Sequence, residues 1–257
     1  DCAPRRFALA RLVPEGESVR AGLLLALAAG ITSLDETASY DHTVKQAWAT
    51  LPDRWQLPNA GLQLSRPGAV TVLRFDPTQP PRGCIVFLHG FGGMLTPYLR
   101  VMAESSLGDH VIVAPMLDPE GWWKGEPGEA VVQRSLALAS SGFSGAAARC
   151  WLVGLSNGAI AALAWASSPR LARSVRGVVL LSGVTRVDGP LEVPTRVLLG
   201  SRDARMQIDR ALPTATALEQ ANPTRATVRT FDADHFLVLS HADAWTTDVA
   251  GWIAAQR

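Results

Sequence analysis

From residue 69 to its end, this 257-residue chain alternates short apolar runs with segments long enough to form helices. Several runs are rich in Val, Ile and Leu and lack the polar–apolar alternation of a strand with one solvated face. They therefore suit a parallel sheet covered on both faces. Alternation of strands and helices predicts an open, doubly wound α/β sheet, whose ligands bind at the carboxyl ends of the strands. The predicted strands are 69–75, 84–89, 110–116, 150–155, 176–182, 196–200 and 226–231, and the predicted helices are 94–106, 129–140, 157–166, 206–220 and 242–255.

Residues 1–67 have a different character. They contain two helical candidates, 17–30 and 36–49, and then a stretch punctuated by prolines. Overlapping the first candidate, Ala21–Ile31 resembles the apolar part of a secretion signal. About twenty residues with both charge signs precede it, so a buried helix capped by Ser18 is favoured instead. The chain begins with Asp rather than Met, which slightly favours export, and the compartment stays open.

Charge and composition exclude several classes of protein. The chain has 24 basic and 23 acidic side chains, a net charge of +1, and no long basic run, so it lacks the electrostatic footprint of a nucleic-acid-binding protein. Its 47% hydrophobic and 18% charged residues exclude overall disorder. No segment reaches the roughly 18 uninterrupted apolar residues of a membrane-spanning helix. We therefore expect a soluble globular protein.

Two of the three cysteines, Cys84 and Cys150, each open an apolar run. The favoured interpretation is a pair of buried thiols that pack as small apolar side chains. If the two runs are neighbouring strands, the thiols can instead form a disulfide. Cys2, next to the first residue, is expected to be exposed and unreactive.

The most informative motif is Gly154-Leu155-Ser156-Asn157-Gly158, which lies between a predicted strand and an Ala-rich helix. A serine at a sharp strand-to-helix turn lies above the sheet in a strained backbone conformation, and glycines two positions before and after it leave room for the turn. The motif alone is weakly specific, and its structural context strengthens it. Ser156 is therefore the predicted nucleophile.

A serine hydroxyl needs a base, and the base needs an acid that orients it. Asp203 and His235 both follow predicted strands, so all three residues lie at carboxyl ends, in the order serine, acid, histidine. We predict that His235 acts as general base and then as general acid, while Asp203 fixes the imidazole tautomer and stabilises its cation. His241 is an alternative base, and Asp118 an alternative acid.

A glycine-rich turn, His89-Gly90-Phe91-Gly92-Gly93, directly follows another predicted strand. Acyl transfer develops negative charge on oxygen, and backbone amides stabilise it. The amides of Phe91 and Asn157 are the predicted donors, and the Phe91 side chain is expected to line the pocket. His89 is expected to brace the loop rather than to take protons. A phosphate-binding loop is excluded, because no Gly-Lys-Ser/Thr follows.

With these motifs, the sequence resembles the α/β-hydrolase family over residues 68–257. The resemblance implies a mostly parallel sheet of about eight strands, an acyl-serine intermediate, and no cofactor or metal. Only one clear strand precedes the run at 84–89, where the family usually has two, so the first is expected to be missing or to lie within 60–68. In addition, Asp-Ala-Asp precedes His235 where small, Gly-rich residues are often found.

Many members of the family insert a helical lid where this chain has only residues 183–195, with two prolines, so no large lid is expected. A cover for the site must then come from an N-terminal helical region, 1–67, or from the loop 117–128. Trp122 and Trp123 in that loop join Phe91 as candidate pocket residues. Alternatively, both tryptophans only pack the loop onto the body.

These features predict a serine hydrolase that cleaves a carboxylic ester, or a thioester, lactone or amide, of a small-molecule acyl substrate. An acyltransferase that uses the same triad is one alternative. A non-catalytic protein that binds a small molecule in the same fold is another. The substrate and the oligomeric state are not predicted.

Overall fold

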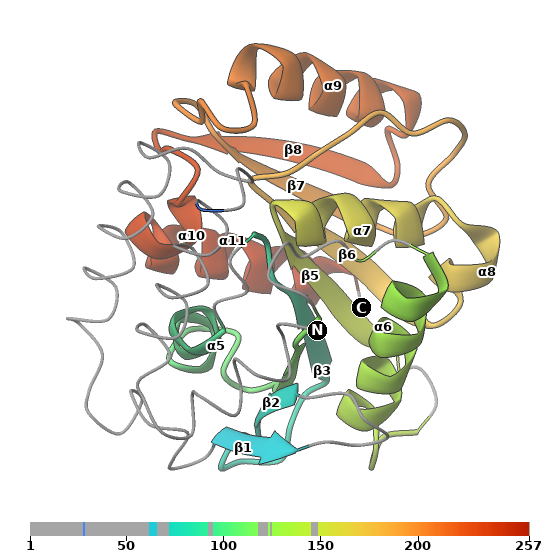
Figure 1. Cartoon of the computed structure of the whole chain (residues 1–257), viewed down its shortest axis with the longest axis vertical. Helices are drawn as coiled ribbons and strands as arrows, with labels where there is room; N and C mark the ends of the chain where they lie inside the picture. The colour runs from blue at the N-terminus through green and yellow to red at the C-terminus, as the bar shows by residue number, and fades with distance from the viewer. Residues whose placement is uncertain are drawn as a thin grey trace.

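In this computed structural model, the described residues are 28, 72–91, 95–117, 123, 125–144 and 149–256, together with the backbone of 62–65. They form one eight-stranded sheet in the order β1-β2-β4-β3-β5-β6-β7-β8 (Figure 1). The strands from β3 onward pair in parallel, and β2 is antiparallel to both of its neighbours. The strands are β1 Leu62–Ser65, β2 Val72–Phe75, β3 Cys84–Leu88, β4 Val111–Pro115, β5 Cys150–Leu155, β6 Val175–Leu181, β7 Thr195–Gly200 and β8 Ala226–Phe231.

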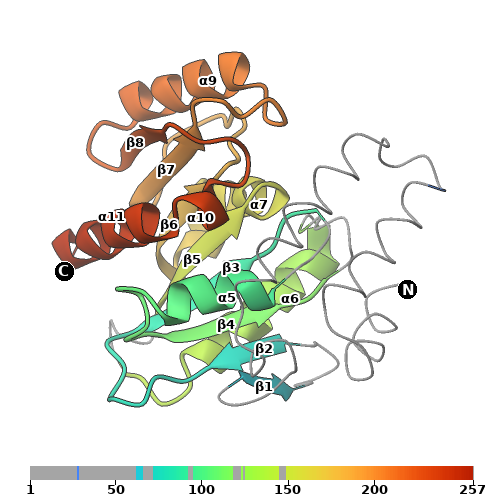
Figure 2. The same cartoon turned by 90° about the vertical axis from the view of Figure 1, so that its left-hand side faces the viewer.

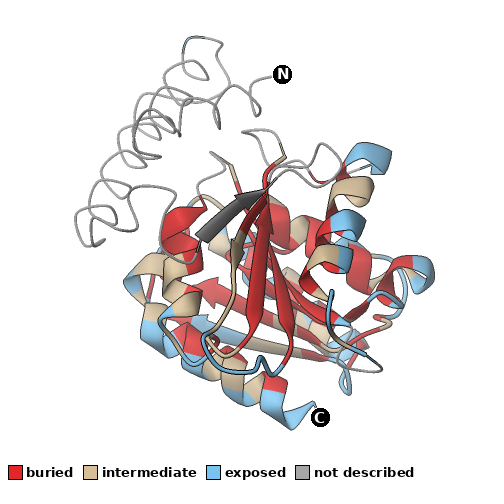
Figure 3. Cartoon of the chain, turned by 90° about the horizontal axis from the view of Figure 1, so that it is seen from below, coloured by how far each residue is buried: buried red, intermediate tan, exposed pale blue. Residues whose placement is uncertain are grey.

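Helices cover both faces of the sheet. The lack of polar–apolar alternation in the strands predicted this arrangement. Helices α5, α10 and α11 pack on one face, in front of the sheet in Figure 2, and α6, α7, α8 and α9 pack on the other. Every residue of β3, β4 and β5 is buried, whereas β8 at the edge exposes two residues (Figure 3). The helices are α5 Thr96–Ala103, α6 Gly125–Ala139, α7 Asn157–Ala166, α8 Pro169–Ala172, α9 Ile208–Ala221, α10 Leu237–Ser240 and α11 Ala242–Ala255.

The chain reverses its direction of travel across the sheet at β3. From β3 it crosses to β4 on one side, and it then returns to β5 on the other side of β3. In an open α/β sheet, ligands bind beside the carboxyl ends of the strands at such a switch point. Here the carboxyl ends of β3 and β5 lead into the glycine-rich turn and into the Ser156 turn.

The first strand of the sheet lies inside the segment 60–68, which is one of the two possibilities expected from the resemblance. Strand β1 pairs with β2, so the sheet begins upstream of residue 68, at which the sequence placed the start of the α/β domain. Apart from residue 28, which is helical and exposed, the predicted helices 17–30 and 36–49, with Ser18, lie outside the described residues. Between β6 and β7, residues 182–194 form neither helix nor strand, so the expected absence of a lid at this place is confirmed.

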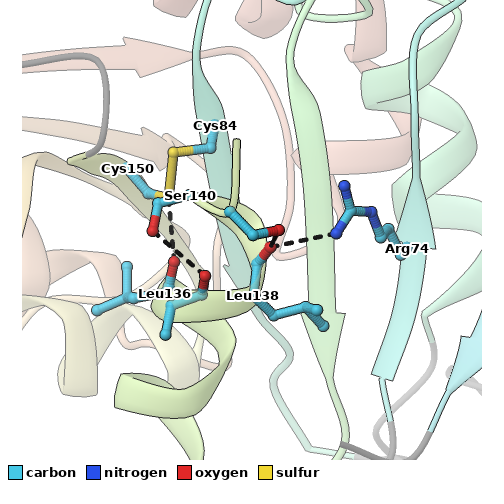
Figure 4. Close-up of a disulfide and its surroundings, with 8 residues drawn as sticks. Arg74, Cys84, Leu136, Leu138, Ser140 and Cys150 are labelled. Carbon is cyan, nitrogen blue, oxygen red and sulfur yellow. Dashed lines mark hydrogen bonds between the residues drawn. A yellow bond between two sulfur atoms is a disulfide. The ribbon is translucent and has the colours of Figure 1, made fainter. Parts of the chain in front are cut away.

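A disulfide joins Cys84 and Cys150, which corrects the favoured interpretation of two free thiols (Figure 4). The two cysteines begin β3 and β5, which are adjacent parallel strands in register at Ile85 and Trp151. This register brings the two Cα atoms to 4.6 Å, and both residues are fully buried. The pairing register, which the sequence leaves open, therefore decides between the two interpretations.

No helix in the described part of the chain is long and apolar enough to cross a lipid bilayer.

Candidate active site

Ser156 occupies the sharp turn between β5 and α7. Its backbone has φ 54° and ψ −115°, a conformation that a residue with a side chain rarely adopts. The turn is held from both sides, because the Ser156 amide donates to the Leu181 carbonyl at 2.8 Å and the Ser156 carbonyl accepts from Ala159 at 2.9 Å. The strained serine predicted from the motif is thus present at this position.

Close packing explains the two glycines of the motif. A Cβ added to Gly154 would lie 2.2 Å from the carbonyl oxygen of Gly158. One added to Gly158 would lie 2.1 Å from the carbonyl oxygen of Leu88 at the end of β3. Both distances are far shorter than van der Waals contact, so a side chain at Gly154 would push the first turn of α7 away from β5, and one at Gly158 would push it away from β3.

Asp203 and His235 meet although 32 residues separate them in the chain. His235 Nδ1 donates to Asp203 Oδ2 at 2.8 Å, and the carboxylate is fully buried. The other carboxylate oxygen, Oδ1, accepts from the Met206 amide at 2.9 Å. Because Nδ1 carries the proton in this hydrogen bond, the neutral imidazole keeps its lone pair on Nε2.

Ser156 and His235 line one pocket of about 220 Å³. Phe91 and Asn157, whose amides were the predicted oxyanion donors, line it as well. Asp203 is not among the lining residues and lies behind the imidazole. The complete lining consists of Gly90, Phe91, Tyr98, Leu155, Ser156, Asn157, Arg205, Met206, His235 and Phe236.

His89 is buried and holds the glycine-rich turn in place. Its Nδ1 donates to the Gly90 carbonyl at 2.7 Å, and its Nε2 accepts from the Leu117 amide at 3.4 Å. Its ring packs edge-on against Trp123, whose indole N–H donates to the His89 carbonyl at 2.9 Å. These contacts agree with the bracing role that the sequence suggested.

The Trp123 contact also places that side chain away from the pocket. Trp123 is 2% exposed, belongs to the core on the α6–α7 face, and is absent from the pocket lining. It therefore packs its loop onto the body, which is the alternative noted from the sequence. Trp122 and the alternative acid Asp118 lie outside the described residues.

The alternative base, His241, does not line the pocket. Its Nδ1 lies 2.9 Å from the Ser240 hydroxyl oxygen, and its ring packs against Phe231. Of the two histidines considered, only His235 shares the pocket with Ser156 and contacts a buried carboxylate.

Six lining residues were not predicted as site residues from the sequence: Gly90, Tyr98, Leu155, Arg205, Met206 and Phe236. Three of them lie within three positions of Asp203 or His235 in the chain, which is a signal that sequence reasoning could have used. Tyr98 comes from α5, and only the packing of that helix on the sheet brings it to the pocket.

In the described part of the chain, no group of three or more His, Cys, Asp or Glu side chains is arranged to bind a metal ion.

Comparison with solved structures identifies the fold. An esterase from Pyrococcus furiosus has a TM-score of 0.60 at 12% identity, over 76% of this chain and 90% of that one. A carboxylesterase from Mesorhizobium loti has a TM-score of 0.58 at 18% identity, over 76% and 99%. This chain has the α/β-hydrolase fold. An enol-lactonase from Burkholderia xenovorans is similar too, with a TM-score of 0.55 at 14% identity, over 75% and 100%.

Sequence comparison adds no closer relative. The chain matches no family profile and no curated protein sequence. At these identities the solved α/β hydrolases establish the fold alone. The candidate site must therefore be judged on its own geometry.

Proposed function

We propose that this α/β-hydrolase chain is a serine hydrolase that cleaves a carboxylic ester of a small molecule. One observation carries the proposal: Ser156 on its strained turn and His235 line the same pocket, while His235 donates a hydrogen bond to the buried Asp203 carboxylate. A nucleophile, a base and an orienting acid in this relation are the requirements of acyl transfer through serine. The esterases among the solved structures of the same fold support the same reaction class.

In the proposed reaction, the Ser156 hydroxyl oxygen attacks the substrate carbonyl carbon while His235 Nε2 takes its proton. Asp203 holds the ring in the tautomer that leaves Nε2 available, and it stabilises the imidazolium. The tetrahedral intermediate collapses, and His235 returns the proton to the departing alcohol. Water, activated by His235, then attacks the acyl-serine and releases the acid.

The negatively charged oxygen of the tetrahedral intermediate needs hydrogen-bond donors to stabilise it. We assign this role to the backbone amides of Phe91 and Asn157, because both residues line the pocket that contains Ser156. Asn157 is the first residue of α7, so the partial positive charge of that helix end also lies beside the oxyanion. The brace around His89 fixes the turn that carries Phe91.

A cover over this site is part of the same proposal. With no helix between β6 and β7, the candidates stay the region 1–67 and the loop 117–128, most of which lie outside the described residues. Thioester, lactone or amide cleavage, and acyl transfer to an alcohol or amine, use the same steps with a different leaving group or acceptor. A panel of substrates separates them.

The nucleophile assignment is tested with a fluorophosphonate probe and a panel of 4-nitrophenyl esters of graded acyl length. We expect Ser156→Ala to abolish both labelling and turnover, because Ser156 is the one serine or threonine among the described residues that line the pocket with His235. Ser240→Ala is a matched control, because Ser240 also lies beside a histidine but outside the pocket. It should keep both activities. Undiminished labelling of Ser156→Ala would refute the assignment. Tight binding of a small molecule without turnover of any ester would favour the non-catalytic alternative.

A further inference from the structure

The end of strand β6 lies between the proposed nucleophile and the proposed acid. The sheet order places β6 between β5, which leads into Ser156, and β7, which leads toward Asp203 (Figure 1). These strands are parallel, so their carboxyl ends meet at one edge of the sheet. The residues that leave β6 there are Leu181-Ser182-Gly183, which we call the β6 turn. The proposed reaction gives them no role.

The β6 turn contacts the backbone of the nucleophile directly. The Leu181 carbonyl accepts from the Ser156 amide at 2.8 Å. Two residues later, the chain packs against the same serine. A Cβ added to Gly183 would lie 2.5 Å from the Ser156 carbonyl oxygen and 2.9 Å from the Ala159 side chain. The β6 turn therefore supports Ser156 from the side of β6, and it leaves no room for a side chain at position 183.

The β6 turn is also attached to the strand that leads to the acid. The Ser182 amide donates to the Leu198 carbonyl of β7 at 2.9 Å, and all three residues of the turn are buried. Strand β7 ends at Gly200, whose carbonyl accepts from the Asp203 amide at 3.2 Å. Backbone contacts thus join Ser156 to Asp203 through the β6 turn and β7.

Ser182 has a backbone conformation that serine rarely adopts. Its φ is 48°, in the left-handed region, and its buried hydroxyl has no hydrogen-bond partner among the described residues. Both features cost stability. In the described part of the chain, the residues other than glycine with a positive φ are Ser156, Ser182 and Gln207. Gln207 lies in the turn that carries Asp203, so this strain is concentrated around the candidate site.

We infer that the β6 turn positions the nucleophile: the left-handed backbone of Ser182 holds Gly183 against Ser156 and thereby sets the distance from the serine oxygen to the His235 imidazole. This inference rests on the proposed function. Misplacing a reacting group by about 1 Å can lower a rate about 100-fold. None of the three residues of the β6 turn lines the pocket. A change in the turn should therefore lower kcat and leave KM nearly unchanged.

Variants of Ser182 separate its backbone conformation from its hydroxyl. Ser182→Val disfavours the left-handed conformation, because a β-branched side chain clashes with the backbone there. We expect its kcat for 4-nitrophenyl esters to fall about 10- to 100-fold with little change in KM. Ser182→Gly, which adopts a positive φ freely, should keep kcat within a few-fold although the hydroxyl is lost.

Ser135→Val is the matched control for bulk at a buried serine. Ser135 is 1% exposed, lies on α6 and does not line the pocket, so this variant should keep kcat even if its stability falls. A Ser182→Val variant that folds and keeps the wild-type kcat overturns the inference. So does a Ser182→Gly variant that loses as much activity as Ser182→Val.

Position 183 tests the contact itself. In Gly183→Ala, the new methyl group must displace the Ser156 backbone, so kcat should again fall about 10- to 100-fold. Gly251→Ala is the matched control, because a Cβ at Gly251 would meet no atom within 4 Å, and its kcat should equal that of the wild type. An undiminished kcat in folded Gly183→Ala overturns the inference.

Hydrogen exchange separates failure of this inference from failure of the proposed function, because it needs no substrate. The Ser156 amide donates to Leu181, so the segment 154–160 should exchange faster in Ser182→Val and in Gly183→Ala than in the wild type. Gly251→Ala should exchange as the wild type does. Mass spectrometry of the digested protein measures this. Faster exchange in both β6-turn variants supports the inference even if the wild type hydrolyses no ester. Unchanged exchange in both overturns it, even if the wild type proves to be an esterase.

Discussion

Single residues at the candidate site are positioned by neighbours that the proposed reaction does not use. The Ser156 backbone is held in its strained conformation by hydrogen bonds to Leu181 and Ala159. Asp203 is held by the Met206 amide, which leaves its second oxygen for His235. Catalytic groups must be fixed before the substrate arrives, because reorganisation during the reaction adds to the barrier. The strain at Ser156 is therefore consistent with a functional role.

Replacing one carboxylate oxygen of Asp203 by an amide nitrogen tests its proposed role as the orienting acid. Asp203→Asn can still accept from the Met206 amide through Oδ1, but its amide nitrogen then faces His235 Nδ1. That contact favours the tautomer with the proton on Nε2, which cannot accept from serine. We expect kcat for ester hydrolysis to fall by roughly 10³- to 10⁴-fold while KM changes little. Asp234→Asn, one residue from His235 and outside the pocket, should keep kcat within a few-fold. A similar loss in both variants would contradict the assignment.

The longer secondary-structure elements agree best with the prediction from the sequence. Helices α7 and α11 and strands β5 and β8 begin and end at the predicted residues, because long apolar runs and Ala-rich segments give strong signals. Two helices, α8 and α10, were missed, because four residues carry no readable periodicity. The site's main residues follow strand ends and were therefore predictable. No role was predicted for Arg205, and the two alternatives for Trp123 stayed open, because loop courses depend on packing that no local pattern encodes.

The disulfide between β3 and β5 gives a prediction at this scale. It closes a segment of 66 residues, and in the chain-entropy description that closure stabilises the fold by about 4 kcal/mol. We expect Cys84→Ala/Cys150→Ala to lower the free energy of urea unfolding by that order, because the unfolded chain gains freedom. Alkylation of the denatured, unreduced protein followed by mass spectrometry should label one cysteine of the three. Cys2→Ala should reduce this label to zero without loss of stability. Three labelled cysteines in the unreduced wild type would contradict the bridge.

At the scale of the whole molecule, an ion-pair cluster joins the C-terminal helix α11 to the last two strands of the sheet. Asp248 on α11 accepts from Arg196 on β7 at 2.9 and 2.8 Å, and it also pairs with Arg229 on β8. The carboxylate is 6% exposed and the Arg196 side chain 15% exposed. Helix α11 packs on the same face of the sheet as α5 and α10, and α10 follows directly after His235. The cluster thus ties the sheet edge to the helical layer that backs the site.

Acid should therefore lower the stability that this cluster contributes between α11 and the sheet. Burial by itself raises the pKa of Asp248, but the hydrogen bonds and charges of Arg196 and Arg229 outweigh it, so the pKa lies below its ordinary value of 3.8. A folded-state pKa below the unfolded one stabilises the protein above pH 3.8, and this contribution disappears as the pH falls through the lower folded-state value. We expect Asp248→Asn to reduce the free energy of unfolding at pH 7 by about 3 kcal/mol, since it leaves a half-buried arginine pair without its anion.

Urea unfolding of wild type and Asp248→Asn at pH 7, 5, 3 and 2 measures this linkage. The difference between the two proteins should stay constant from pH 7 to 5 and shrink at the lowest pH values, where the wild-type carboxylate becomes protonated. Asp188→Asn provides the control, because Asp188 is 97% exposed and its partner Arg186 is 90% exposed, so the loss of this pair should not alter the unfolding curve. A difference for Asp248→Asn that persists unchanged to pH 2 would mean that the side chain stabilises α11 by packing rather than by its charge.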